Sequence, residues 1–250
     1  MPRPHFYFNG CSFTEGAELN NKEEDRFSKL IARHFNALEV NEARGGGSNY
    51  RIVRMFVDAM SKQRFRHVFI MWTSLDRYEH WAGREDGGYD SVTFHRLFPE
   101  QAPESKGVWN HQKQYVDRPK MLKGLQEYTL NVRTDNQCVA DFLSHVLTVQ
   151  TMCKLSRTPY TMTSYQHKRV LAQVDKVINT TAIENPQEHE YLLEKYKLID
   201  WDNWLQHKNF GFLEMAETNN LKIGADGHPL EEAQIQIAKF AIRRMEQTND

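Results

Sequence analysis

Residues 67–72 form an uninterrupted apolar run, His-Val-Phe-Ile-Met-Trp. A strand with one face in water alternates apolar and polar side chains, whereas a parallel strand covered on both faces is apolar throughout. Parallel neighbours must be joined by crossover connections, which are usually helices. This run therefore predicts an α/β protein whose parallel sheet is covered by helices on both faces.

The rest of the chain alternates between strand-like and helix-like segments. Short apolar runs that end in turn residues predict further strands at 6–8, 38–40 and 159–165. Apolar residues at helical spacing predict helices over 26–35, 52–60 and 136–154 and a closing helix up to 245, with Pro229 in its first turn. Because crossovers between parallel strands are right-handed, we expect a three-layer α/β/α, flavodoxin-like sheet.

Two long segments interrupt this alternation. Residues 78–135 are rich in Gly, Pro, His and aromatic side chains, and residues 167–212 are polar with scattered tryptophans and a helix expected near 187–196. Structureless connections of such length are uncommon inside a domain. We expect one domain over residues 1–250 with inserted lid segments at 78–135 and 167–212, lying over the sheet edge or the site.

Charge and composition narrow the choice of partners. The chain has 32 Lys and Arg against 33 Asp and Glu, so no global field favours nucleic acid or an anionic membrane, and a small-molecule or glycan substrate is expected. Three cysteines without a CxxC pair argue against a disulfide framework. The eleven histidines show no HExxH or paired spacing, so we expect no metal and no cofactor. The oligomeric state is not indicated.

The beginning of the sequence carries no recognisable export signal. Only the apolar residues 6–8 precede Asn9-Gly10, which is too short for a signal-peptide core or a membrane span. Together with the unpaired cysteines, this predicts a cytoplasmic setting.

Four polar clusters lie just after expected strands or just before expected helices. They are Ser12, Gly47 with Asn49, Thr73 with Ser74, and Asp226 with His228. In open parallel sheets, ligands bind outside the carboxyl ends of the strands. We therefore expect these clusters to meet in one site.

These residue types suit acyl transfer. A serine hydroxyl becomes an effective nucleophile when a histidine takes its proton, and a third group usually orients that histidine. Ser12 and His228 form the candidate pair. The oxyanion that develops needs donors, for which the backbone N–H groups of Ser12 and Gly47 and the Asn49 side chain are candidates.

Several of these clusters also match family motifs. Gly10-Cys11-Ser12-Phe13-Thr14-Glu15-Gly16 resembles the first block of the SGNH (GDSL-type) hydrolases, residues 45–49 resemble the second, and Asp226-Gly227-His228-Pro229 resembles the last. The resemblance implies a serine esterase or acylhydrolase of an acyl or acetyl ester of a carbohydrate or small metabolite. It implies Ser12 as nucleophile, His228 as base, Asp226 as orienting acid and the Gly47 N–H in the oxyanion hole.

The sequence departs from the family pattern at three places. Cys11 stands where the family has Asp, and Thr73-Ser74 replaces the third-block asparagine, so a hydroxyl of Thr73 or Ser74 is the substitute donor. Asp226 precedes His228 by two residues rather than three, which leaves open a dyad oriented by a backbone carbonyl. The chain is also similar to SGNH-like proteins of tailed bacteriophages and their hosts, which would place it in the host cytoplasm or the virion.

Other interpretations stay open. The departures are compatible with a binding or structural protein that keeps the fold without catalysis. Residues 45–47 could cradle a phosphate, although no P-loop lysine follows them. Arg77 and Tyr78 are candidates for the substrate pocket, but an arginine there also suits a carboxylate of the lid.

Overall fold

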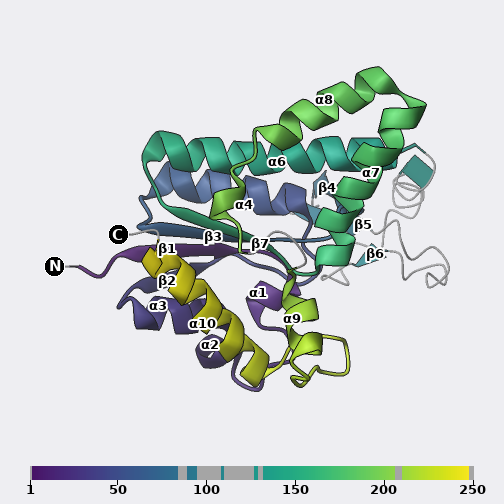
Figure 1. Ribbon diagram of the computed structural model, residues 1–250. Helices are drawn as coiled ribbons and strands as arrows, with labels where there is room; N and C mark the ends of the chain where they lie inside the picture. Colours follow the sequence, from purple (N-terminus) through teal and green to yellow (C-terminus); the bar gives the residue numbers. More distant parts are fainter. Residues whose placement is uncertain are drawn as a thin grey trace.

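Four parallel strands form the central sheet of the computed structural model, which describes residues 2–83, 89–94, 108–109, 127–128, 132–205 and 210–247. Their order is β2-β1-β3-β7 (Figure 1). The strands are β1 (His5–Asn9), β2 (Leu38–Asn41), β3 (His67–Trp72) and β7 (Tyr160–Ser164). The four strands expected from the sequence are thus confirmed.

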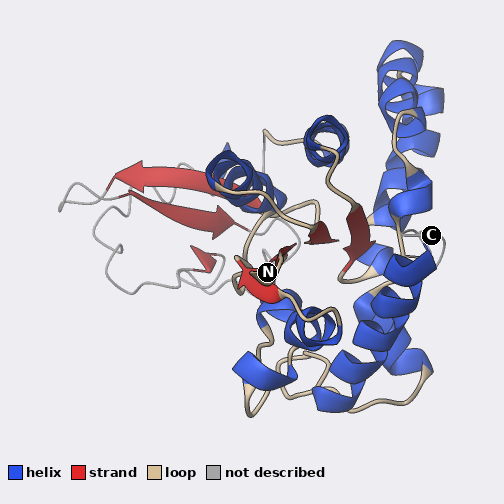
Figure 2. Ribbon diagram, turned by 90° about the vertical axis from the view of Figure 1, so that its left-hand side faces the viewer, coloured by secondary structure: helices blue, strands red, loops and turns tan. Residues whose placement is uncertain are grey.

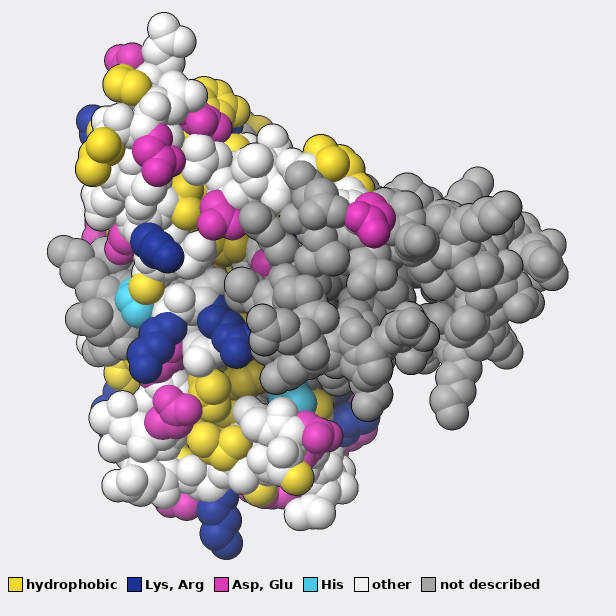
Figure 3. Space-filling view, turned by 90° about the vertical axis from the view of Figure 1, so that its right-hand side faces the viewer, with side chains coloured by type: hydrophobic (Ala, Val, Ile, Leu, Met, Phe, Trp, Pro, Cys, Tyr) yellow, Lys and Arg dark blue, Asp and Glu magenta, His cyan; other side chains and the backbone are white. Residues whose placement is uncertain are grey.

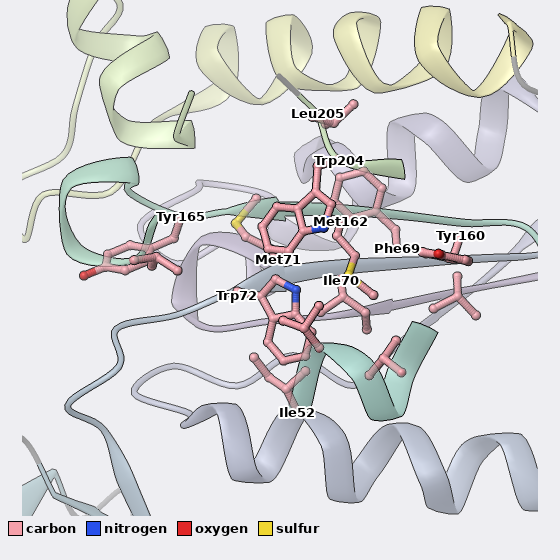
Figure 4. Close-up of a cluster of buried hydrophobic side chains, with 14 of the residues drawn as sticks. Ile52, Phe69, Ile70, Met71, Trp72, Tyr160, Met162, Tyr165, Trp204 and Leu205 are labelled. Atoms are coloured by element: carbon pink, nitrogen blue, oxygen red, sulfur yellow. The ribbon is translucent and has the colours of Figure 1, made fainter. Parts of the chain in front are cut away.

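β3 is the centre of the core, as its uniformly apolar sequence predicts. All six of its residues are buried, and it pairs in parallel with β1 on one side and β7 on the other. Figure 4 shows Trp72 pointing toward Ile52, whereas Trp204 lies on the opposite side of the sheet. Side chains of β3 thus alternate between two apolar layers.

Helices cover both faces of the sheet (Figure 1). One face carries α3 (Phe27–His34) and α10 (Glu231–Gln247), and the Phe27 ring lies 5.3 Å from that of Phe69. The other face carries α4 (Asn49–Lys62) and α6 (Asp135–Ser156), where Phe142 lies 5.6 Å from Trp72. The three-layer α/β/α architecture is confirmed.

Three further helices of the described chain are short. They are α1 (Ser12–Glu15), α2 (Lys22–Asp25) and α9 (Phe212–Thr218). The closing helix α10 begins at Glu231, so the expectation that Pro229 lies in its first turn is wrong. Pro229 instead forms an antiparallel bridge with Ile223, which closes a hairpin-like loop before the helix.

The two expected insertions contain secondary structure. In the first, β4 (Tyr78–Gly83), β5 (Tyr89–Phe94) and β6 (Val108–Trp109) form an antiparallel sheet to one side of the central sheet (Figure 2). Much of residues 84–131 lies outside the described residues. That this segment acts as a lid stays a prediction.

The second expected insertion is mainly helical. It contains η2 (His167–Arg169), α7 (Leu171–Glu184), α8 (Pro186–Lys197) and η3 (Trp201–Asn203). α8 confirms the helix expected near 187–196, and Trp204 adds a parallel bridge to Met162 at the outer edge of β7. No helix in the described part of the chain is both long and apolar enough to span a bilayer.

Candidate active site

Ser12 lies at the carboxyl end of β1. Two residues, Gly10 and Cys11, separate the strand from α1, and Ser12 is the first residue of that helix. A Cβ atom at Gly10 would lie 2.2 Å from Thr14 Oγ1 and 3.0 Å from the Met71 carbonyl, so only glycine fits this close approach. Cys11 is fully buried, which fits a packed thiol rather than a reactive one.

The structure brings Ser12 and His228 together. His228 Nε2 lies 2.8 Å from Ser12 Oγ, although 216 positions separate the two residues in the chain. The imidazole also packs against Phe13, with ring centroids 5.3 Å apart. A hydroxyl and an imidazole nitrogen at this separation are within the range needed for proton transfer.

A third side chain, Glu18, completes the hydrogen-bonded series. Its Oε2 atom lies 2.7 Å from His228 Nδ1 and accepts the His228 backbone N–H at 3.1 Å. Its Oε1 atom accepts the Asp226 backbone N–H at 2.9 Å. The side chains of His228 and Glu18 keep only 15% and 20% of their surface exposed.

The expectation that the Asp226 carboxylate contacts His228 is therefore corrected, because Glu18 occupies that position. The turn at Asp226-Gly227, in which Gly227 has φ 85°, presents the Asp226 backbone N–H to Glu18. In the described part of the chain the Asp226 carboxylate has no hydrogen-bond partner. The acid that contacts the imidazole comes from the segment after α1.

The charge of Glu18 determines the tautomer of His228. The hydrogen bond from the Asp226 N–H, together with those from His228, lowers the pKa of Glu18, so its carboxylate is ionised at neutral pH. An ionised carboxylate only accepts hydrogen bonds. His228 Nδ1 must then carry the ring proton, which leaves Nε2 as an acceptor for the Ser12 hydroxyl.

Sequence reasoning missed Glu18 because no motif marks it. It follows Ser12 by six residues in a polar segment, and its backbone has φ 64°, a conformation that glycine favours. The sequence feature that relates to Glu18 is Gly224, the glycine that faces its carboxylate. A Cβ atom there would be 2.5 Å from Glu18 Oε1, so this glycine permits the carboxylate to reach the loop.

The loop at residues 45–47 does not offer the oxyanion donor that the sequence predicts. The Gly47 N–H donates to the Arg44 carbonyl at 2.9 Å, so the expectation that it is available to substrate is wrong. The preceding residue, Gly46, has φ 70°. Within the described ranges, the backbone N–H groups of Gly46 and Ser12 have no hydrogen-bond acceptor in the protein.

Asn49 is not available as an oxyanion donor either. Its Nδ2 donates to the Thr73 carbonyl at 3.0 Å, its Oδ1 accepts the Thr73 N–H at 3.0 Å, and the residue is only 3% exposed. The amide therefore ties the first turn of α4 to the end of β3. This structural use corrects the role expected for Asn49.

The two hydroxyls after β3 differ from each other. Ser74 donates its hydroxyl to Asp76, so it already has a partner. Thr73 Oγ1 is buried and has no hydrogen-bond partner among the described residues. Of the two substitute donors expected from the sequence, Thr73 is the one whose hydroxyl is unengaged.

Arg77 and Tyr78 occupy different environments. Arg77 Nη1 donates to the Gly47 carbonyl at 3.2 Å, and its guanidinium lies 5.8 Å from the centre of the Tyr165 ring, which packs on Phe13. Tyr78 instead packs against Tyr50 and the Arg133 guanidinium, and burial raises its pKa. The contacts connect Arg77, but not Tyr78, to the surroundings of Ser12.

A hollow of about 360 Å³ opens beyond the carboxyl end of β3. Its walls combine both signs of charge and include Ser74, Asp76, Asp135, Lys168, Arg169 and Lys176. Figure 3 views the molecule from the side on which the strands end, and Lys and Arg side chains gather near the middle of that face. No group of His, Cys, Asp or Glu arranged to hold a metal ion occurs among the residues that the structure describes.

The sequence matches no known family model and no curated protein. Solved structures do match. An esterase EstA from Pseudoalteromonas sp., inhibited by monoethylphosphonate, aligns with a TM-score of 0.51 at 11% identity over 99% of this chain and 100% of that one. TesA aligns with a TM-score of 0.51 at 11% identity over 97% and 98%.

A third structure, a putative lipolytic protein of the G-D-S-L family from Desulfitobacterium hafniense DCB-2, aligns at 11% identity over 97% and 99% of the two chains, with a TM-score of 0.46. At 11% identity, the alignments with EstA and TesA establish a shared fold and not a shared activity. The chain has a parallel α/β fold that it shares with the esterase EstA and with TesA.

Proposed function

We propose that this protein is a serine esterase in which Ser12 is the nucleophile and His228 the general base. The observation that carries the proposal is the 2.8 Å approach of His228 Nε2 to Ser12 Oγ at the carboxyl edge of the sheet. Ligands of open α/β sheets bind at that edge. The fold shared with esterases supports the same class of reaction.

The proposed reaction has two halves. Ser12 Oγ attacks the ester carbonyl carbon while His228 Nε2 takes the hydroxyl proton, and the alcohol leaves with that proton as the acyl-enzyme forms. Water then attacks the acyl carbon, again giving its proton to His228. Ser12 recovers a proton from the imidazole, and the carboxylic acid is released.

The oxyanion needs donors that have no other partner. The Ser12 N–H and the Gly46 N–H meet this condition within the described residues, and Thr73 Oγ1 is a further candidate. Gly46 replaces the donor that the sequence indicates, Gly47, because the Gly47 N–H already donates to the Arg44 carbonyl. Removing one such donor typically costs about 10²- to 10³-fold in kcat.

The substrate we propose is an acyl or acetyl ester of a carbohydrate or small metabolite. Arg77, between the glycine loop and the Tyr165 ring that packs on Phe13, is the pocket residue that we assign to this substrate. The alternative is a protein that keeps the fold as a binding module. It is favoured by one observation, the engagement of Asn49 with Thr73 in a site that also lacks the third-block asparagine.

Ester hydrolysis by the wild type and a Ser12→Ala variant separates the two functions. With p-nitrophenyl acetate and butyrate as substrates, we expect the variant to lose about 10³-fold or more in kcat, because the nucleophile is gone while binding groups remain. A Ser144→Ala variant serves as a matched control, because Ser144 lies on α6 and its hydroxyl bonds to Ala140 and Lys195 rather than to the candidate site. Equal rates for the wild type and Ser12→Ala would favour the binding module.

A further inference from the structure

We propose that Glu18 is the acid of this site and acts as a positioning residue for His228, in place of the aspartate of the last sequence block. The inference rests on the proposed function, since it assigns a role within the same site. In this arrangement Ser12 and Glu18 lie six residues apart in the segment after β1, whereas His228 lies in the loop before α10.

The role proposed for Glu18 is supported first by the hydrogen bonds that its carboxylate accepts. It accepts three hydrogen bonds, from His228 Nδ1 at 2.7 Å, from the His228 N–H at 3.1 Å and from the Asp226 N–H at 2.9 Å. One carboxylate therefore holds both the ring and the backbone of His228. Two points of attachment fix the direction of Nε2 better than a ring contact alone.

The loop around His228 is shaped to receive this carboxylate. The Gly224 N–H donates to the His228 carbonyl at 2.8 Å, and Ile223 pairs with Pro229, so the loop closes on itself. Gly224 leaves a space next to Glu18 in which a Cβ atom would lie 2.5 Å from Oε1. The backbone of one loop and the side chain of another therefore fit together.

The segment that carries Glu18 is fixed independently of His228. Gly16 ends α1 in a left-handed conformation with φ 85°, and Glu18 follows with φ 64°. Both the backbone N–H and the side-chain amide of Asn20 bond to Glu231 at the start of α10, at 3.3 and 3.0 Å. A backbone strained at Glu18 and tied on both sides is typical of functional sites.

The chemistry expected of Glu18 is electrostatic. A carboxylate beside Nδ1 holds the tautomer with Nε2 free and stabilises the imidazolium that forms when Ser12 gives up its proton. Asp226 has no described contact that would let it do so. Its carboxylate is two residues from His228 in the chain but lies in the turn that offers Glu18 a backbone N–H.

The experiment compares Glu18→Gln, Glu18→Asp and Asp226→Asn in the full chain. We expect Glu18→Gln to lower kcat by about 10²- to 10⁴-fold with little change in KM, because the amide can stabilise the wrong tautomer. Glu18→Asp should recover part of this loss, and Asp226→Asn should stay within about 3-fold of the wild type.

A second readout does not depend on turnover. The ring nitrogen-15 shifts of His228, measured by NMR without substrate while the ring is neutral, should report the Nδ1–H tautomer in the wild type and in Asp226→Asn, and a shift toward the Nε2–H tautomer in Glu18→Gln. A shift in Asp226→Asn but not in Glu18→Gln would overturn the assignment. If the wild type hydrolyses no ester while the NMR shift appears, the proposed function fails but the pairing of Glu18 with His228 stands.

Discussion

Close packing between Glu18 and Gly224 is a strict geometric condition on the candidate site. The carboxylate lies where a Cβ atom of residue 224 would be, 2.5 to 2.7 Å from all three of its outer atoms. Contacts under 3 Å with a Cβ atom force a displacement. A single methyl group at this position should therefore separate the acid from the histidine.

Gly224→Ala is expected to reduce esterase activity by about 10-fold or more, because misplacing a catalytic group by about 1 Å costs rate on the order of 10²-fold. The measurement is kcat/KM for p-nitrophenyl acetate alongside the thermal unfolding midpoint. Gly227→Ala is the matched control in the same loop. An added Cβ atom at residue 227 would meet nothing within 4 Å, so Glu18 keeps its place. The left-handed backbone there (φ 85°) makes the alanine cost about 1 kcal/mol of stability. Equal activity losses in the two variants would contradict the argument.

At this scale the sequence located some residues and not others. Ser12 and His228, which lie within hydrogen-bond distance of each other, are marked in the sequence by a strand end and by the loop before the last helix. The sequence also offers the Gly47 N–H and the Asn49 amide as oxyanion donors, but these groups bond to Arg44 and Thr73. Residue type and spacing identify a possible donor, whereas its actual partner depends on tertiary contacts that spacing does not contain.

Among the elements, strands and long helices were predictable because burial on one or both faces leaves a periodic pattern. α7 was missed although its buried residues recur at helical spacing, at Leu171, Val174, Val177, Ile178 and Thr181. That pattern lies inside a segment whose overall polarity indicated an insertion. The polar average composition of residues 167–212 thus concealed the helical spacing of the apolar residues in α7.

Short elements at the carboxyl edge were less predictable. α1 has four residues, too few to show a period, and its start is set by Gly10 and Cys11 rather than by a side-chain cap. The contact between the start of α4 and the end of β3 is equally hard to predict from the sequence. Asn49 occupies the first helical position and pairs both polar groups of its amide with Thr73, an arrangement between elements that no local pattern encodes.

The whole molecule buries two imidazoles far from the candidate site. His67 at the start of β3 is 3% exposed and lies 3.0 Å from Thr161 Oγ1, and burial lowers its pKa to about 3. Burial likewise lowers the pKa of His145 on α6 to about 4. The His67 ring is folded into the core as a neutral group, and the half-buried His145 ring is neutral as well.

This burial makes stability depend on pH. A histidine whose pKa is lower in the folded state than in the unfolded chain stabilises the fold fully above about pH 6.5, and that contribution is lost as pH falls toward the folded value. Between pH 8 and pH 5, His67 alone should remove about 2 kcal/mol from the free energy of unfolding. Over the same range few carboxylates take up protons.

Urea unfolding at pH 8 and pH 5 measures the effect, with His67→Gln as the comparison because glutamine can bond to Thr161 without titrating in this range. We expect the variant to lose about 2 kcal/mol less than the wild type over this interval. An identical pH dependence in the two proteins would mean that His67 is not buried as a neutral group.

At the same scale, the account depends on two chain segments 216 positions apart meeting at one edge of the sheet, so that Ser12 gives its proton to His228. The most direct measurement is reaction with a fluorophosphonate probe followed by mass spectrometry of the labelled peptides. We expect covalent labelling at Ser12 in the wild type, and its loss in both Ser12→Ala and His228→Ala. Labelling at another residue, or labelling of Ser12 that persists undiminished in His228→Ala, would contradict the claim.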